Sequence, residues 1–169
     1  EGLCEARYRG QIAAAVFPQT LPGKAGILWL SRLVPPQAAD SFLRLIGMSL
    51  DFFVAHRVRL AYTLFPEVRP ELESVLARHD FRFLAELFYL GCPAEEFPAD
   101  EPELPLQFES FSSAGHERLA RVVEGTYRET LDCADLKDVR STEDVIEGYR
   151  GIGEFSPDRW FVVRQGEAD

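Results

Sequence analysis

Three apolar runs decide the fold: GILWL (residues 26–30), LAYTLF (60–65) and FRFLAELFYL (81–90). Each run is short and bounded by turn or charged residues, which is typical of a strand. Between the first two runs, apolar residues recur every three or four positions from Leu43 to Phe53, which predicts an amphipathic helix. Pro70 suits the first position of a second helix before the third run. The order strand, helix, strand, helix, strand predicts a sheet covered by helices.

The residues before the first run predict an antiparallel start to this sheet. Residues 3–8 and 11–17 are strand-like, and Arg9-Gly10 between them is typical of a hairpin turn. Residues 21–24 form a second predicted turn, with Pro and Gly at its centre. We therefore expect an α/β fold of mixed α+β character, with a mostly antiparallel, twisted sheet flanked by helices.

A boundary is predicted at residues 93–105, PAEEFPADEPELP. Repeated Pro and like charges disfavour a helix and favour an extended, acidic linker. The net charge of −10 also changes there. Residues 1–92 hold ten Lys/Arg and nine Asp/Glu, whereas residues 93–169 hold eight and nineteen.

The part after the linker predicts strand, helix, helix, strand. Residues 107–111 and 160–164 have strand character, and Leu119 to Thr126 lie on a helical pattern. Residues 141–144, STED, resemble a capping box with Asp in place of the usual Glu, which predicts the start of a second helix.

Composition excludes several classes of protein. The acidic part would repel a phosphate backbone, which argues against a nucleic-acid partner, whereas it is compatible with amine substrates. No apolar run approaches the ~18 residues of a membrane-spanning helix, and the first residues lack the layout of a secretory signal. Cys4, Cys92 and Cys133 are odd in number and lack metal-ligand spacing, so we expect a reduced, cytoplasmic protein without a metal site.

Two stretches carry a resemblance to a known family. LARHDF (residues 76–81), which runs on to the aromatic segment FYL (88–90), resembles the end of a domain of the GNAT N-acetyltransferase superfamily. That family closes with an apolar helix, a Gly-Phe pair and an aromatic strand, and Asp80 stands here in place of the Gly. Residues 126–133, followed by EGYR (147–150) and DRWF (158–161), are similar to the start of the second domain in tandem-GNAT, mycothiol-synthase-like bacterial proteins.

The resemblance implies a domain organisation. Residues 1–92 would be a GNAT-like domain without its first strand and first two helices, and 93–105 would be the linker. Residues 106–169 would begin a second such domain. The chain would then be one GNAT period cut out of phase, which means that it runs from the second strand of one domain to the second strand of the next. We expect the elements at 106–164 to pack beside residues 1–92. They would do so within one chain, as a permuted domain, or between two chains of a homodimer by exchange.

The resemblance also implies acetyl-CoA as the cofactor. The family holds its pyrophosphate on backbone N–H groups in a loop before the long helix, a placement that suits an anion. The family pattern falls on residues 32–37, where Arg32 fits but Pro35 replaces a Gly and Gln37 a Gly or Ala. Pro35 and Pro36 have no amide hydrogen. We therefore expect this loop not to bind the cofactor.

Four residues are candidates for an amine pocket, because the first two helices of a GNAT fold and the loop between them shape the acceptor site. They are Tyr127, Asp132, Arg159 and Trp160. The alternative reading is structural, with Asp132 and Arg159 as loop anchors and Trp160 in a core. His56 and His79 end predicted helices, where a cation offsets the helix dipole. No catalytic acid or base is predicted.

Three function classes remain open. The first is an N-acyltransferase that moves an acetyl group from acetyl-CoA to a small-molecule amine, or part of one. The second is a catalytically inactive GNAT-like scaffold or ligand-binding module, which the proline-filled loop favours. The third is an unrelated α/β ligand-binding domain.

Overall fold

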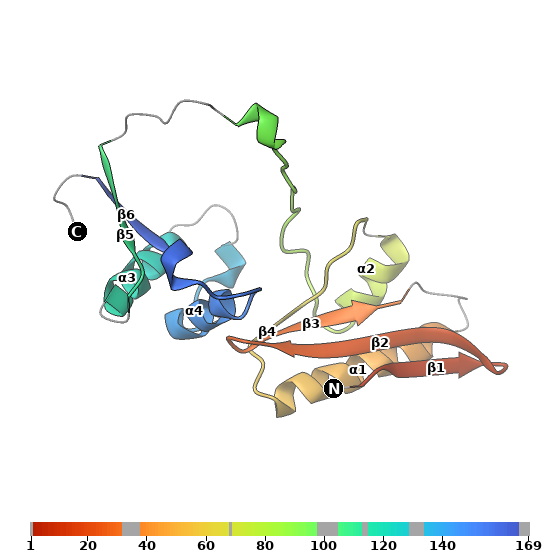
Figure 1. The fold of residues 1–169 in the computed structure, drawn as a ribbon. Helices are drawn as coiled ribbons and strands as arrows, with labels where there is room; N and C mark the ends of the chain where they lie inside the picture. The colour runs from red at the N-terminus through yellow and green to blue at the C-terminus, as the bar shows by residue number, and fades with distance from the viewer. Residues whose placement is uncertain are drawn as a thin grey trace.

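A computed structural model describes residues 2–31, 38–67, 69–97, 105–112, 115–128 and 134–165. These residues form four α-helices, six strands and three short 3-10 helices, which confirms the mixed α+β fold class. The strands lie in two separate sheets, one of four strands and one of two. Figure 1 shows the larger sheet with its helices at one end of the molecule and the smaller sheet at the other.

The four-stranded sheet has the strand order β1-β2-β3-β4. Strands β1 (Cys4–Tyr8), β2 (Gln11–Leu21) and β3 (Ala25–Leu30) are antiparallel neighbours, and β4 (Leu60–Tyr62) is parallel to β3. The pairing of β1 reaches only as far as Val16 of β2. Beyond Val16 the edge of β2 that faces away from β3 has no partner among the described strands, and Pro18 lies in this part of the strand. Its missing N–H therefore removes no hydrogen bond from the pairing with β3.

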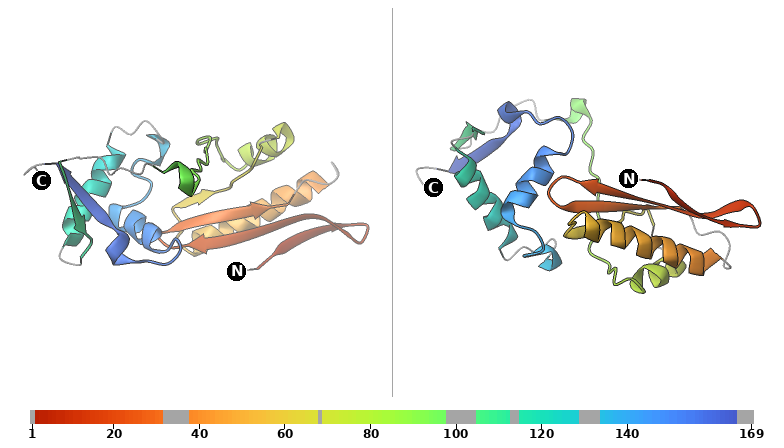
Figure 2. Two further views of the ribbon diagram at one scale, coloured as in Figure 1. Left: turned by 45° about the horizontal axis from the view of Figure 1, so that its top comes forward. Right: turned by 90° about the horizontal axis from the view of Figure 1, so that it is seen from below.

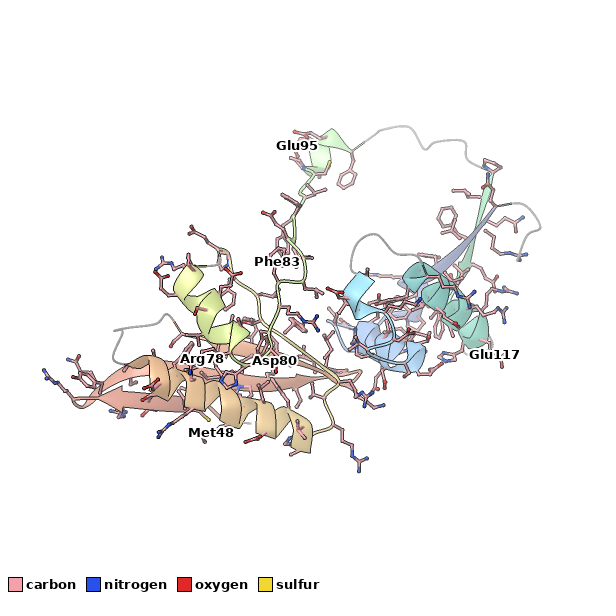
Figure 3. The ribbon with its side chains drawn as sticks, turned by 180° about the vertical axis from the view of Figure 1, so that it is seen from behind. Met48, Arg78, Asp80, Phe83, Glu95 and Glu117 are labelled. Atoms are coloured by element: carbon pink, nitrogen blue, oxygen red, sulfur yellow. The ribbon has the colours of Figure 1, made fainter. Side chains whose placement is uncertain are left out.

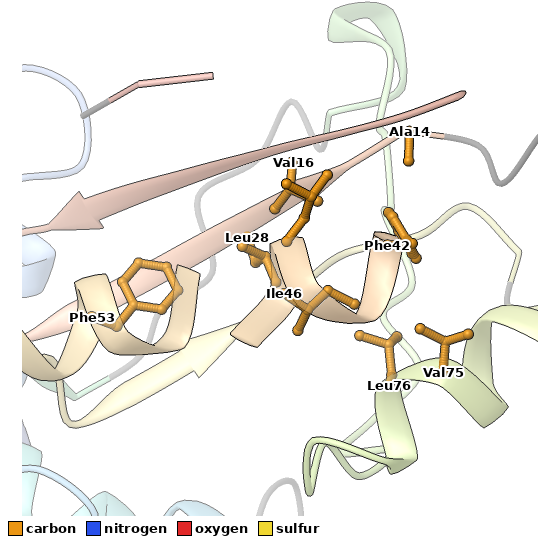
Figure 4. Packing of buried hydrophobic residues seen from close by; sticks show 9 residues of the cluster. Ala14, Val16, Leu28, Phe42, Ile46, Phe53, Val75 and Leu76 are labelled. Atoms are coloured by element: carbon orange, nitrogen blue, oxygen red, sulfur yellow. The ribbon is translucent and has the colours of Figure 1, made fainter. Parts of the chain in front are cut away.

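Helix α1 (Ala39–Ala55) makes the crossover from β3 to β4. Its buried residues recur at helical spacing and lie against the sheet: Phe42, Leu45, Ile46, Ser49 and Phe53. Figure 4 shows Ile46 beneath Val16 and Leu28, and Phe42 beneath Ala14. At Gly26 a Cβ would lie 2.6 Å from the Phe53 ring, so only glycine lets that ring rest directly on β3.

Helix α2 (Pro70–Ala77) adds Val75 and Leu76 to the same core. Pro70 occupies the first turn, as predicted, and Asp80 leaves the helix with φ of 61°, in the left-handed region. His56 caps the end of α1, whereas His79 follows α2 and its ring Nε2 lies 2.9 Å from the carbonyl oxygen of Leu43.

The prediction of a strand at residues 81–90 is wrong for this structure. These residues pair with none of the described strands, and the chain runs away from the sheet as a single extended segment (Figure 3). The neighbouring edge is short, because β4 covers 60–62 rather than the predicted 60–65. A strand exists only where a partner accepts its main-chain hydrogen bonds. Alternating apolar residues alone could not reveal whether that partner is present.

The linker connects this segment to the smaller part of the molecule. Within it, the short 3-10 helix η2 (Ala94–Glu96) is exposed, and residues 98–104 lie outside the described ranges. Strand β5 (Leu106–Ser110) then pairs antiparallel with β6 (Phe161–Gln165). Residues 106–110 therefore pair with β6 in a sheet of their own and with none of the described strands of the four-stranded sheet.

Helices α3 (His116–Tyr127) and α4 (Thr142–Arg150) cover a second, smaller core of Val123, Val145 and Ile146. The predicted capping box is present at the start of α4. Ser141 Oγ accepts a hydrogen bond from the Asp144 amide, and Asp144 Oδ2 accepts one from the Ser141 amide.

The two parts touch where the β2–β3 turn meets α4, a contact visible in Figure 2. Lys24 Nζ lies 2.9 Å from Asp144 Oδ1, and Arg140 donates a hydrogen bond to the Gly23 carbonyl oxygen. Gly23 has φ of 73°, and a Cβ on it would lie 1.9 Å from the Asp144 carbonyl oxygen. Glycine is therefore required both by the turn and by the close approach of the helix backbone.

Within the residues that the structure describes, none of the helices combines the length and the apolar character that crossing a bilayer requires.

Candidate functional site

Two of the predicted site residues, Tyr127 and Trp160, pack against the same core of Val123, Val145 and Ile146 but line different cavities. Tyr127 ends α3, Arg159 lies in the 3-10 helix η5 (Pro157–Arg159), and Trp160 follows it directly. Asp132 lies outside the described residues, so its predicted role as a pocket residue or loop anchor has no structural counterpart here.

Trp160 is part of a packed aromatic cluster, as its structural alternative predicted. Its ring meets Phe155 edge-on at 4.9 Å between centroids and Phe111 at 5.9 Å, and it packs against the core of α3 and α4. The Arg150 guanidinium lies 5.1 Å and 5.4 Å from the centroids of Phe111 and Phe155. This geometry stabilises the junction of α4 and β6.

Tyr127, in contrast, lines a cavity of about 340 Å³ between the end of α3, residues 136–140 and the start of α4. Leu60, the first residue of β4, reaches the same cavity, so both parts of the molecule contribute to its wall. A concave site of this size at the junction of two parts is the usual location of a small-molecule site.

The cavity wall carries more basic than acidic side chains. Arg128, Lys137 and Arg140 line it together with Glu124 and Asp138. Arg128 is neutralised by Glu124 at 3.0 Å, and Arg140 is held by the Gly23 carbonyl oxygen. Among the described residues neither Lys137 nor Asp138 has an ion-pair partner, so the wall offers one unpaired charge of each sign, and Lys137 suits an anionic group of a ligand.

Tyr127 is linked to Tyr149 of α4 by a hydrogen bond of 3.4 Å between their hydroxyl oxygens. Burial, with a further contribution from this bond, raises the pKa of Tyr149 to about 12. Tyr149 also lines a second, apolar cavity of about 370 Å³ that includes Phe111 and Trp160. The tyrosine pair thus separates the charged cavity from the apolar one.

Polar side chains of α3 and α4 form a network around His116. Nε2 of His116 lies 2.9 Å from Oε2 of Glu143, and an Arg150 nitrogen lies 3.5 Å from the His116 Nδ1. Because the guanidinium can only donate, Nδ1 accepts and Nε2 carries the proton that is given to Glu143. Both ring nitrogens are then engaged, which favours a structural role for His116 over one as a base.

Sequence reasoning missed Lys137 and Tyr149 as site residues. The signal for Tyr149 is its helical spacing from Val145, which places it on the side of α4 that meets α3. Lys137 follows the 3-10 helix η4 (Ala134–Leu136) and gives no pattern, because its position in the wall depends on how the two helices pack.

The cofactor loop at residues 32–37 lies outside the described ranges, so its predicted loss of donors stays a prediction from sequence. Among the described residues, no three His, Cys, Asp or Glu side chains lie together in a way that could hold a metal ion. Cys4 and Cys92 are both free thiols.

Searches of protein-family models, of curated proteins and of solved structures gave no match to this chain.

Proposed function

We propose that this chain is part of a GNAT-type N-acyltransferase and that the cavity beside Tyr127 holds the amine acceptor. The observation that carries the proposal is the cavity itself, which is lined by Tyr127, one of the predicted pocket residues. The sheet supports it, because three antiparallel strands followed by a helical crossover to a parallel β4 are the arrangement that the family resemblance implies. The free thiols are in keeping with a cytoplasmic protein.

The residues that the resemblance assigns to acetyl-CoA do not fit the cofactor. Pro35 and Pro36 remove two backbone N–H donors from the loop at 32–37. The chain's own contribution is then to bind and orient the acceptor, and holding a reactant in position is a large part of catalysis. We expect no heat of binding when acetyl-CoA is titrated into the isolated chain. Micromolar binding that CoA competes away would contradict the assignment.

The charges of the wall narrow the class of acceptor. Lys137 favours an amine that also carries a carboxylate, since the ammonium group alone would meet a wall with a basic excess. Phenylalanine, phenylalaninamide and phenethylamine form a matched set that differs only at the carboxyl group. We expect calorimetry to give at least about tenfold tighter binding for phenylalanine than for either of the others.

Matched variants connect this binding to the cavity. Tyr127→Phe and Lys137→Gln should each weaken binding of phenylalanine by about fivefold to tenfold, because each removes one polar contact. Tyr8→Phe and Arg121→Gln make comparable chemical changes outside the cavity wall and should leave binding unchanged. Equal effects in the two pairs would show that the ligand binds elsewhere.

The second candidate is a catalytically inactive scaffold, which the proline-filled loop favours. A scaffold would show neither amine binding nor transfer of a labelled acetyl group from acetyl-CoA to any amine. Amine binding without transfer is the result expected for an acceptor-binding part of an enzyme. A homodimer formed by exchange of the elements at 106–164 is compatible with either function.

A further inference from the structure

Residues 81–90, FRFLAELFYL, are an exposed apolar segment that has no strand partner among the described residues. Phe83, Leu87, Phe88 and Tyr89 are 70%, 59%, 78% and 88% exposed. Figure 3 shows Phe83 on the stretch that leaves the sheet, away from both cores. A soluble protein rarely leaves such a run uncovered, because exposed strand-forming segments pair with other chains.

The pattern of the segment is that of a strand with one apolar face. Over residues 81–87 the odd-numbered residues are all apolar, and the even-numbered residues are Arg82, Leu84 and Glu86. Alternation of this kind places the two sets on opposite faces of an extended chain. Arg82 and Glu86 form no ion pair among the described residues, so their charges are available to a partner.

The two charges specify the partner. If two copies pair antiparallel about Leu84, Arg82 of each copy lies opposite Glu86 of the other, and the pairing makes two cross-strand ion pairs. The same register places Phe81 opposite Leu87 and Phe83 opposite Ala85. A parallel, in-register pair would instead place Arg82 beside Arg82. The outer edge of β4 offers no charge to either residue, because residues 60–65 are LAYTLF.

We propose that residues 81–87 form an antiparallel strand pair with the same residues of a second copy of this chain, with Leu84 at the two-fold axis. The pairing gives the main chain of each segment a row of hydrogen-bond partners and brings the two apolar faces side by side. It does not depend on the acceptor cavity, and it differs from exchange of the elements at 106–164.

Sedimentation of the full chain tests the proposal. We expect the mass to rise from 19.1 kDa towards twice that value as the concentration passes through the micromolar range. Arg82→Glu and Glu86→Arg should each weaken the dimer at least about tenfold, because each places two like-charge pairs in register. The double variant Arg82→Glu/Glu86→Arg exchanges the charges and should restore the wild-type affinity. A chain that stays monomeric, or a double variant no better than the single ones, would overturn the proposal.

Cross-linking tests the register independently. With Cys4, Cys92 and Cys133 replaced by serine, Leu84→Cys should form a disulfide-linked dimer on mild oxidation, because residues at the axis of a strand pair have their Cβ atoms about 5 Å apart. Met48→Cys places a more accessible thiol on α1, since the native Met48 is 59% exposed and Leu84 is 40% exposed, and it is the control for random collision. Equal rates for the two variants would exclude the register. A monomer whose 81–90 amides resist hydrogen exchange would show that the segment pairs within its own chain, which also overturns the proposal.

Discussion

Replacing Gly23 with alanine should loosen the contact between the two parts of the molecule. The new Cβ would lie 1.9 Å from the Asp144 carbonyl oxygen, where ordinary contacts begin at 3.4 Å, so turn and helix must separate by about 1.5 Å. This movement stretches the ion pair between Lys24 and Asp144, which is half-exposed on the lysine side and worth about 0.5–1 kcal/mol. It also breaks the hydrogen bond from Arg140 to the Gly23 carbonyl, worth about 1 kcal/mol.

The left-handed backbone at Gly23 adds a cost of about 1–2 kcal/mol for any residue with a Cβ. The total is about 3 kcal/mol. Gly153 provides a matched control, since it has the same φ of 73° and no atom lies within 4 Å of the position that an added methyl group would take. Gly153→Ala should therefore cost only the backbone part, about 1–2 kcal/mol.

The chain's two tryptophans make the assay specific, because Trp29 lies in β3 and Trp160 lies in the second core. Urea unfolding followed through each tryptophan, with Trp29→Phe to isolate Trp160, reports the two parts separately. In the wild type we expect overlapping midpoints. Gly23→Ala should lower and separate them, whereas Gly153→Ala should affect mainly the Trp160 signal. If the two variants lose the same free energy of unfolding to within about 0.5 kcal/mol, the turn does not couple the parts.

Three further predictions concern α4 and its neighbours. Hydrogen bonds from Lys24 and then Ser141 lower the pKa of Asp144 below its usual 3.8. Its stabilising contribution is therefore present above pH 3.8 and is lost as the pH falls through the lowered pKa. Asp144→Ala should cost about 1–2 kcal/mol at pH 7 and progressively less as the pH is lowered through the acid range, measured by urea unfolding. The phenol of Tyr149 should titrate near pH 12 in an ultraviolet absorbance titration. Tyr127→Phe should move the pKa of Tyr149 back towards 10, because it removes the hydrogen bond between the two hydroxyl groups. An unchanged pKa would show that burial alone raises it. Ile146→Ala should destabilise the second core by about 2–5 kcal/mol, because Ile146 is fully buried. Ile152→Ala is the control, at a residue that is 77% exposed. It should leave the urea midpoint measured through Trp160 fluorescence unchanged.

Much of the secondary structure could be predicted from local pattern. The crossover helix, the turn at Arg9-Gly10, the capping box at Ser141 and the exit at Asp80 follow from side-chain periodicity and from the backbone preferences of single residues. Such features depend on a few neighbouring positions, so the sequence is sufficient to locate them.

The site could be predicted only in part. Tyr127 is a candidate from the sequence, whereas Tyr149 and the basic Lys137 join it through the packing of α3 on α4. Trp160 packs in an aromatic cluster with Phe111 and Phe155 and also lines the apolar cavity, a position that depends on Phe111, which is distant in sequence.

The sequence by itself determined which segments of this protein are able to form helices and strands. Only the tertiary structure decided which strands are paired: residues 107–111 pair with β6, and residues 81–90 pair with none of the described strands of their own chain. The reason is physical. The residues of a strand themselves determine which of its faces is apolar. Its main-chain hydrogen bonds, however, need a neighbouring strand, and the position of that neighbour depends on the rest of the chain.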